Sequence, residues 1–231
     1  MCVMDKARVY LAGPEVFSPE AKEMGRLSQW TCSNYGLKGL YPLDNEIEAN
    51  GKHETAQAIV KANIELIDSC DYIIANLNNF RGSNIHPACD SGTAWECGYG
   101  IQKGKIVIAH TANINSIPEE IQKNIHLIVP NFFTAVELTQ RVLFRTIELP
   151  NYQPKRLALN LDALYSDVHD ANAETAFKVG SLFARGITPK VKISSPNVTQ
   201  IQRYGTLDAN GYSVEDFDYP VNIMIACTSK W

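Results

Sequence analysis

The sequence predicts an α/β protein with a Rossmann-like (flavodoxin-like) architecture, in which a five-stranded parallel sheet has helices on both faces. Two observations predict this fold. Over residues 1–148, short apolar runs of strand length alternate five times with longer amphipathic segments, which is typical of a parallel sheet covered on both faces. Small and acidic residues follow several of these runs, at the edge of a parallel sheet where ligands bind.

The first two strand–helix units come before residue 70. Residues 9–12 form an apolar run that a Gly-Pro pair ends, and residues 18–20, Ser-Pro-Glu, have the N-cap, first-turn proline and early acid that begin a helix. Gly36 is expected to end this helix. The run at 40–43 predicts the end of the second strand, and apolar spacing over 55–69 predicts the second helix.

Three further strands and two helices complete the predicted sheet. Residues 71–77 and 105–109 are apolar runs that flank a segment of helical character at 90–100. A fifth strand is expected at 125–129, after only a short connection. The last helix is expected to begin with a capping box, Thr-Ala-Val-Glu, and to cover 134–144.

The rest of the chain contains a weak echo of the first half. Residues 149–154 include two prolines and predict a linker, and residues 155–231 are interpreted as a partial, degenerate repeat. This interpretation rests on residues 175–180, which resemble residues 93–98 at a constant offset of 82 positions. A chance match over so few positions is the alternative.

Two carboxylates, Asp90 and Glu96, lie around the start of the predicted helix at 90–100. The helix dipole favours an ionised carboxylate there, and one aimed into a cleft can attack an electrophilic carbon, as in retaining glycosyl transfer. Asp90 could bind a substrate hydroxyl or handle a proton. The alternatives are a solvent-facing glutamate and a plain N-cap aspartate. In the repeat, Asn172 and Lys178 stand in place of the two acids.

Three other positions are candidates for the same site. Tyr10 lies near the end of the first strand, where it could orient a carboxylate or be an ordinary half-buried tyrosine. Asn63 shares the buried stripe of its helix, so its amide needs a partner, which is either a ligand or a neighbouring loop. Asp44, Asn45 and Glu46 follow the second strand, although turn chemistry alone also explains them.

Composition argues against several classes of function. The 231 residues carry a net charge of −4 with a pI near 5.7, which gives no electrostatic case for binding a nucleic acid polymer or an anionic membrane. The apolar runs are too short to span a bilayer and no signal-peptide core is present, so a cytoplasmic protein with six reduced cysteines is expected. Neither metal-ligand spacing nor a dinucleotide or triphosphate motif is present, so no metal and no cofactor are expected.

Taken together, these segments resemble the nucleoside 2-deoxyribosyltransferase family. The matching pieces lie in family order at 10–14 (Tyr-Leu-Ala-Gly-Pro), 42–45 (Pro-Leu-Asp-Asn), 76–82 and 90–98. The resemblance implies that residues 1–148 form a catalytic domain that transfers a 2-deoxyribosyl group between nucleobases in nucleoside salvage. It also implies deoxyribonucleosides and free nucleobases as ligands, no cofactor, and a homo-oligomer with shared sites.

The resemblance assigns roles to individual residues. It implies that Glu96 is the nucleophile that attacks C1′ of the sugar, that Tyr10 orients Glu96, and that Asp90 contacts the sugar hydroxyls. Asn63 stands where some family members have an aspartate that helps to protonate the departing base, so the general acid stays open. The residues implied to bind substrate are Gly13, Asp44, Asn45, Glu46, Asn63, Phe80, Arg81, Gly92, Asn222 and Met224.

One family segment is displaced in this chain. Residues 220–226 (Pro-Val-Asn-Ile-Met-Ile-Ala) resemble a family loop that reaches the sugar, whereas the connection between residues 109 and 125 lacks that loop. The repeat is therefore expected to supply a substrate-closing loop, either within the chain or to a partner subunit. Two other functions stay open: an N-glycosidase that hydrolyses the same ester with water, and a non-catalytic nucleoside-binding protein.

Overall fold

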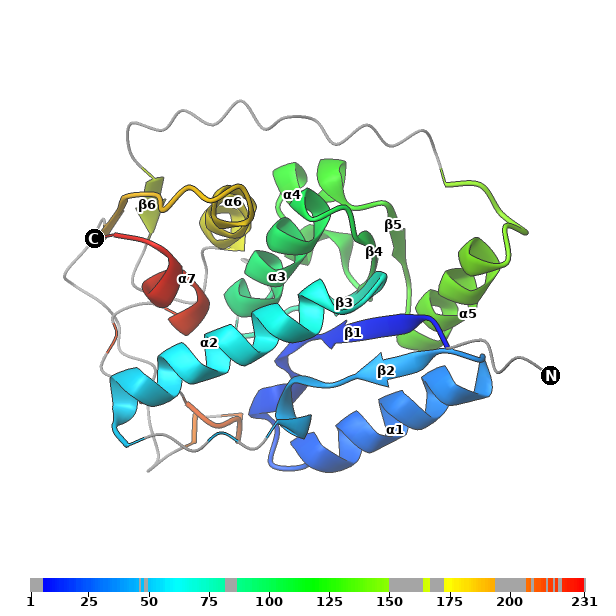
Figure 1. Ribbon diagram of the computed structural model, residues 1–231, viewed down its shortest axis with the longest axis horizontal. Coiled ribbons are helices and arrows are strands. Elements are labelled where there is room, and N and C mark those ends of the chain that lie inside the picture. The colour runs from blue at the N-terminus through cyan, green and yellow to red at the C-terminus, as the bar shows by residue number, and fades with distance from the viewer. Residues whose placement is uncertain are drawn as a thin grey trace.

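The computed structural model contains a five-stranded parallel sheet with the strand order β2-β1-β3-β4-β5 (Figure 1). Its strands are β1 (Arg8–Ala12), β2 (Lys38–Leu40), β3 (Tyr72–Asn76), β4 (Ile106–His110) and β5 (Leu127–Val129). This is the flavodoxin-like strand order, so the predicted fold class is confirmed. The residues that the structure describes are 6–45, 47, 50–81, 87–149, 164–166, 173–193, 207–208, 210–214, 216–217, 219 and 222–230.

Helices cover both faces of this sheet. Those on one face are α1 (Ala21–Asn34) and α5 (Phe132–Leu143), and those on the other are α2 (Lys52–Asp68), α3 (Ser91–Gln102) and α4 (Glu119–Asn124). Successive side chains of a strand point to opposite faces. In β1, Leu11 accordingly packs with the α1–α5 layer and Tyr10 with the α2–α3 layer. Because both faces are buried, β1, β3 and β4 are mostly apolar runs, which is why they could be predicted.

The C-terminal elements pack on the α2–α3 layer. They are β6 (Leu164–Ser166), α6 (Ala173–Ala184), β7 (Val191–Ile193) and α7 (Ile223–Thr228). β6 and β7 pair in parallel as a separate two-stranded sheet. In Figure 1, α6 and α7 lie beside α3 and α2, on the side away from β1 and β2. The predicted linker, apart from Leu149, lies outside the described residues.

Four local predictions were wrong. Residues 40–43 were expected to be the end of the second strand, but β2 ends at Leu40 and Pro42–Asp44 form the 3-10 helix η2. The 3-10 helix η1 (Pro14–Phe17) comes before α1, so Ser18 ends η1 and Glu20 is the N-cap of α1. The side chain of Asn131 accepts from the backbone N–H of Thr134 at 2.9 Å, so α5 begins earlier than the predicted capping box. The connection between β4 and β5 is not a simple loop, because it contains the 3-10 helix η3 (Ile114–Ser116) and α4.

The predicted end of α1 is confirmed. Gly36 follows the helix with φ of 75°, a left-handed conformation that glycine adopts without the steric cost of a β-carbon. Among the described residues, no helix is both long and apolar enough to cross a membrane.

Candidate active site

A cavity of about 470 Å³ lies where the loops after β1, β2 and β3 converge. The order of the strands reverses between β1 and β3, which is where open α/β sheets bind their ligands. The cavity is lined from both ends of the chain by Gly13, Val16, Phe17, Pro42, Leu43, Asn45, Ile47, Ile59, Asn63, Asp90, Gly92, Thr93, Glu96, Ser213, Val214, Asp216, Phe217, Asn222, Ile223 and Met224.

Glu96 is carried into this cavity by α3. The helix begins at Asp90, whose carboxylate accepts from the backbone N–H and from the hydroxyl of Thr93, both at 2.7 Å. Asp90 is therefore the N-cap of α3, which the sequence offered as the alternative to a role in chemistry. The same residue also lines the cavity. Glu96 is only 6% exposed, so it is not a solvent-facing glutamate. Its carboxylate therefore meets the cavity rather than bulk water.

The Glu96 carboxylate has two neighbours in the α2–α3 layer. The hydroxyl of Tyr10 donates a hydrogen bond to Oε1 of Glu96 at 2.6 Å. The amide Nδ2 of Asn63, on α2, lies 3.4 Å from the same oxygen. Both neighbours are buried, so the sheet and α2 hold the carboxylate in one orientation. The buried side-chain amide of Asn63 therefore has a carboxylate as its partner, and that carboxylate belongs to a residue that lines the cavity.

Burial sets the protonation of Glu96. Loss of solvation raises its pKa, the hydrogen bond from Tyr10 lowers it, the nearby charge of Asp90 raises it, and together they place the pKa at about 8. The expected helix-dipole stabilisation is therefore outweighed by burial. Burial and the charge of Glu96 also raise the pKa of Tyr10 well above its ordinary value, so Tyr10 stays a hydrogen-bond donor.

The loops after β1 and β2 place only some of the predicted residues at the cavity. Gly13 and Asn45 line it. Asp44 is not among the lining residues, because its carboxylate accepts from the side chain of Gln29 at 2.6 Å and from the backbone N–H of Tyr41 at 3.3 Å. Turn chemistry therefore accounts for Asp44. Glu46 lies outside the described residues.

Gly92 lies where a side chain would be in tight contact with two residues of the site. A β-carbon at Gly92 would lie 3.2 Å from Oδ2 of Asp90 and 3.3 Å from Nδ2 of Asn222. Glycine therefore lets the start of α3 approach α7 closely. Asn222 is the N-cap of α7, and its side chain accepts from the backbone N–H of Met224 at 2.9 Å. Asn222 and Met224 both line the cavity, opposite α3.

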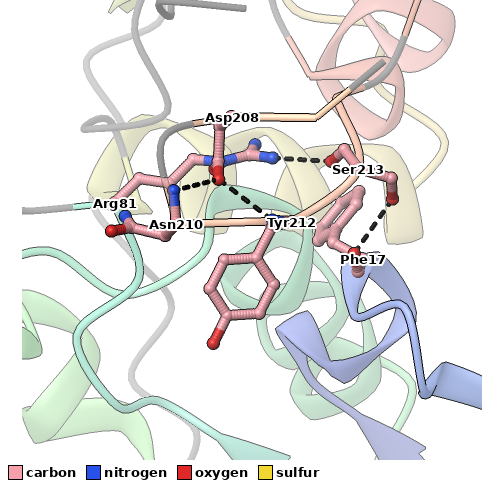
Figure 2. A network of polar contacts seen from close by, with 6 residues as sticks. All are labelled: Phe17, Arg81, Asp208, Asn210, Tyr212 and Ser213. Carbon is pink, nitrogen blue, oxygen red and sulfur yellow. Dashed lines mark hydrogen bonds and ion pairs between the residues drawn. The ribbon is translucent and has the colours of Figure 1, made fainter. Parts of the chain in front are cut away.

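Arg81 and Phe80 lie beside the cavity and not among its lining residues. The guanidinium of Arg81 forms an ion pair with Asp208 at 2.9 Å and donates to the backbone carbonyl of Ser213 at 2.7 Å (Figure 2). Its central carbon lies 4.6 Å from the ring centroid of Phe80 and 5.2 Å from that of Phe17. These contacts hold residues 207–208 and 210–214, named here the wall segment, against the N-terminal half.

Asp208 organises the wall segment from within. Its carboxylate accepts from the backbone N–H groups of Asn210 at 2.8 Å and Tyr212 at 3.0 Å, as Figure 2 shows. Burial alone would raise its pKa, but Arg81 and these N–H groups together lower it. Ser213 in turn donates its backbone N–H and its hydroxyl to the carbonyl of Phe17, at 2.8 and 3.0 Å. Arg81 thus contacts the cavity wall, and its contact with substrate stays a prediction.

Several lining residues were not predicted. Phe17 and Ile59 are apolar, and their pattern indicated only burial. Ser213, Asp216 and Phe217 come from a part of the sequence with no local signal. The resemblance of neighbouring residues to family loops was the only indication that this region reaches the site. Among the described residues, no group of three or more histidine, cysteine, aspartate or glutamate side chains could hold a metal ion.

Comparison with known proteins identifies the family. The model of the family described as nucleoside 2-deoxyribosyltransferase matches residues 9–224. The chain belongs to the nucleoside 2-deoxyribosyltransferase family. The match reaches from β1 to Met224, so this family region includes both Glu96 and Asn222.

Three similar proteins differ from this nucleoside 2-deoxyribosyltransferase family member at most aligned positions. An uncharacterized protein of Schizosaccharomyces pombe is 34% identical over 117 residues, which are 49% of this chain and 54% of that protein. The chain thus spans about half the length of the curated relative it matches. Two solved structures are similar. A 2-deoxyribosyltransferase from Bacillus psychrosaccharolyticus is 23% identical, over 64% of this chain and 100% of that one, with a TM-score of 0.47. A 2-deoxyribosyltransferase from Leishmania mexicana is 30% identical, over 46% of this chain and 65% of that one, with a TM-score of 0.40.

Proposed function

We propose that this chain transfers a 2-deoxyribosyl group from one nucleobase to another through a covalent ester on Glu96. One observation carries the proposal: a buried carboxylate faces a cavity of nucleoside size and receives a 2.6 Å hydrogen bond from Tyr10. Family membership supports the reaction class. A role in cytoplasmic nucleoside salvage is part of the same prediction.

The reaction has two displacements at one carbon. In the first, ionised Glu96 attacks C1′ of the sugar, the C1′–N bond breaks, and its electron pair leaves with the base, which takes up a proton. In the second, a ring nitrogen of the acceptor base attacks C1′, the ester bond breaks, and Glu96 regains its charge while the acceptor loses a proton. Two inversions retain the configuration at C1′.

The neighbours of Glu96 suit these steps. Tyr10 fixes the carboxylate through Oε1, which aims it before substrate arrives, and this arrangement reduces the entropy cost of attack. Asp90 lines the cavity at the first turn of α3 and is the group proposed to bind a sugar hydroxyl. The amide of Asn63 cannot supply an acidic proton, so the departing base is proposed to take its proton from solvent.

The charges around the cavity favour an uncharged substrate. Two acids at the start of α3, Asp90 and Glu96, line it, and none of its described lining residues is a lysine or arginine. A third lining acid, Asp216, is paired with Lys52 at 3.1 Å. Carboxylates repel a phosphate, so a nucleoside is favoured over a nucleotide. The apolar lining, including Phe17, Ile59 and Phe217, suits the faces of a nucleobase.

Base exchange tests the proposal. The protein is incubated with deoxyinosine and adenine, and formation of deoxyadenosine is followed by chromatography. Glu96→Gln is the matched inactive variant, because it keeps the shape of the side chain and removes the nucleophile. Formation of hypoxanthine at one rate with and without adenine would favour the N-glycosidase. A wild-type protein that binds nucleoside without converting it would favour the non-catalytic alternative.

A further inference from the structure

α3 and α6 are equivalent helices in two parts of the chain. α3 covers Ser91–Gln102 and α6 covers Ala173–Ala184, so both are 12 residues long and their bounds differ by 82 positions. Each is followed by a glycine with φ of 76°, Gly104 and Gly186, again 82 positions apart. The backbone of the two segments therefore agrees beyond the few residues in which the sequences resemble each other.

The two helices contact one another reciprocally. A β-carbon on Gly98 would lie 2.1 Å from the carbonyl oxygen of Phe177, and one on Gly180 would lie 2.2 Å from the carbonyl oxygen of Trp95. Adding the offset of 82 turns Gly98 into Gly180 and Trp95 into Phe177. Exchanging the two helices therefore converts each of these contacts into the other. A contact that maps onto itself in this way is the property of a twofold axis.

The correspondence continues past the helices. In the sheet, Ile108 of β4 pairs in parallel with Leu127, and 82 positions later Lys190 forms a parallel bridge with Lys230. A six-residue helix precedes the second partner in each case, α4 before Leu127 and α7 before Lys230. Contacts between the two parts of the chain follow the same correspondence, since α3 contacts α7 and its counterpart α6 contacts α4. α7 thus corresponds to α4.

The two halves have lost different parts of the site. Asn222 is the N-cap of α7, whereas its counterpart at the N-cap of α4 is Pro118, which has no side-chain amide. Glu96 of α3 corresponds to Lys178 of α6, whose ammonium pairs with Glu174 on its own helix. One half therefore keeps the carboxylate and the other keeps the asparagine. Both line the same cavity.

We propose that the α3–α6 contact is an internal twofold interface, so that one chain carries one complete site with Glu96 and Asn222 acting in cis, and its second site is lost. The face of α3 that another copy would use is already covered by α6, with carbonyl oxygens of each helix against glycines of the other. A shared homo-oligomeric site is then not needed. This proposal concerns the site of the proposed function, but its geometry does not depend on that function.

Complementation tests the cis arrangement. Differently tagged Glu96→Gln and Asn222→Ala chains are co-expressed and purified through both tags in turn or as a mixture, and base exchange is measured. A site in cis gives no activity beyond the sum of the two variants. A site shared between two copies restores roughly a quarter of wild-type activity in a random mixture, because half the dimers are mixed and each has one intact site. Such restoration would overturn the proposal.

A second measurement does not use activity. Gly180→Leu places a side chain against the carbonyl of Trp95, and the melting temperature of this variant is measured over a wide range of protein concentration. An internal interface gives a lowered melting temperature that is independent of concentration. Arg185→Leu, at an exposed position just after α6, is the control. A Gly180→Leu defect that high concentration reverses would contradict the internal interface, whereas a wild type inactive in base exchange would contradict only the proposed function.

Discussion

The hydroxyl of Tyr10 donates a 2.6 Å hydrogen bond to Oε1 of Glu96, joining the inner strand β1 to α3 inside the α2–α3 layer. The bond is buried at both ends. A donated hydrogen bond favours the ionised carboxylate, whereas burial and Asp90 favour the protonated form. The balance places the pKa of Glu96 at about 8, so changes in either neighbour should be visible in the pH dependence of the reaction.

Tyr10→Phe should move the acidic limb of the pH–rate profile to higher pH. The proposed nucleophile must be ionised, so kcat/KM of the wild type should rise with pH up to about 8. Removing the Tyr10 hydroxyl removes a group that lowers the pKa of Glu96. A shift of one pKa unit would reduce the rate at neutral pH about tenfold. A lower rate with an unchanged limb would show that Tyr10 does not act through the ionisation of Glu96.

Asp90→Asn should move the same limb in the opposite direction. The charge of Asp90 raises the pKa of Glu96, and asparagine removes that charge while remaining a good N-cap for α3. The pH profile of kcat/KM is the measurement, and circular dichroism checks that the fold is kept. The variant should also lose rate at its plateau, because the proposed sugar contact is weakened. A limb that stays in place would exclude electrostatic coupling between the two acids.

Glu96→Gln should stabilise the protein at alkaline pH. The folded pKa is about 8 and the ordinary value is 4.5, so between these two the folded state holds a proton that the unfolded state has lost. Stability of the wild type is therefore expected to fall as the pH rises through this window, and glutamine removes the effect. The gain should be small near pH 4.5 and on the order of a few kcal/mol above pH 8.

Urea denaturation of both proteins across that window measures the effect. The exposed Glu137 on α5 provides the control, because Glu137→Gln changes a carboxylate that is not buried. A constant difference between wild type and Glu96→Gln at all pH values would contradict the prediction, since it would show that the carboxylate has the same protonation in the folded and unfolded states.

β1, β3 and β4 could be predicted because both faces of the sheet are buried there, which makes each of these strands a mostly apolar run. β2 has no such run, because it consists of Lys-Gly-Leu and Lys38 is exposed. Helix starts could not be predicted equally well. Ser18 has the composition of an N-cap, but Pro14–Phe17 form a 3-10 helix first and use Ser18 to end it. Asn131 caps α5 in competition with Thr134, because both residue types accept from backbone N–H groups. Where two local capping signals are equally strong, tertiary packing determines which residue caps the helix.

Some residues of the candidate site could likewise be predicted and others could not. Glu96, Asp90 and Asn63 could be predicted because helical periodicity and the strand ends bring them to one place. The contact of Arg81 with the cavity wall could not be predicted, since its partner Asp208 lies 127 residues away in the sequence. Ser213 and Phe217 also reach the cavity only through this long-range packing. Sequence periodicity carries no information on contacts of that kind.

Arg81→Lys should weaken substrate binding more than it slows the chemistry. Lysine keeps the charge but loses the planar fork that joins Asp208 to the carbonyl of Ser213, and it loses the stacking on Phe17 and Phe80. Arg81 is also held with φ of 58°, a conformation that packing must maintain. The wall segment should become less ordered while Glu96 and Tyr10, on β1 and α3, stay in place.

The expected result is an increase in KM of roughly tenfold, as for loss of a charged hydrogen bond, with kcat changed much less. Arg141→Lys on α5 is the matched control, because Arg141 is half exposed and pairs only loosely with Glu137 at 3.8 Å. Asp208→Asn should reproduce the Arg81→Lys phenotype, since it breaks the same ion pair from the other side. Equal losses of kcat in both variants with an unchanged KM would instead mean that the wall segment takes part in the chemical step and does not merely close the cavity.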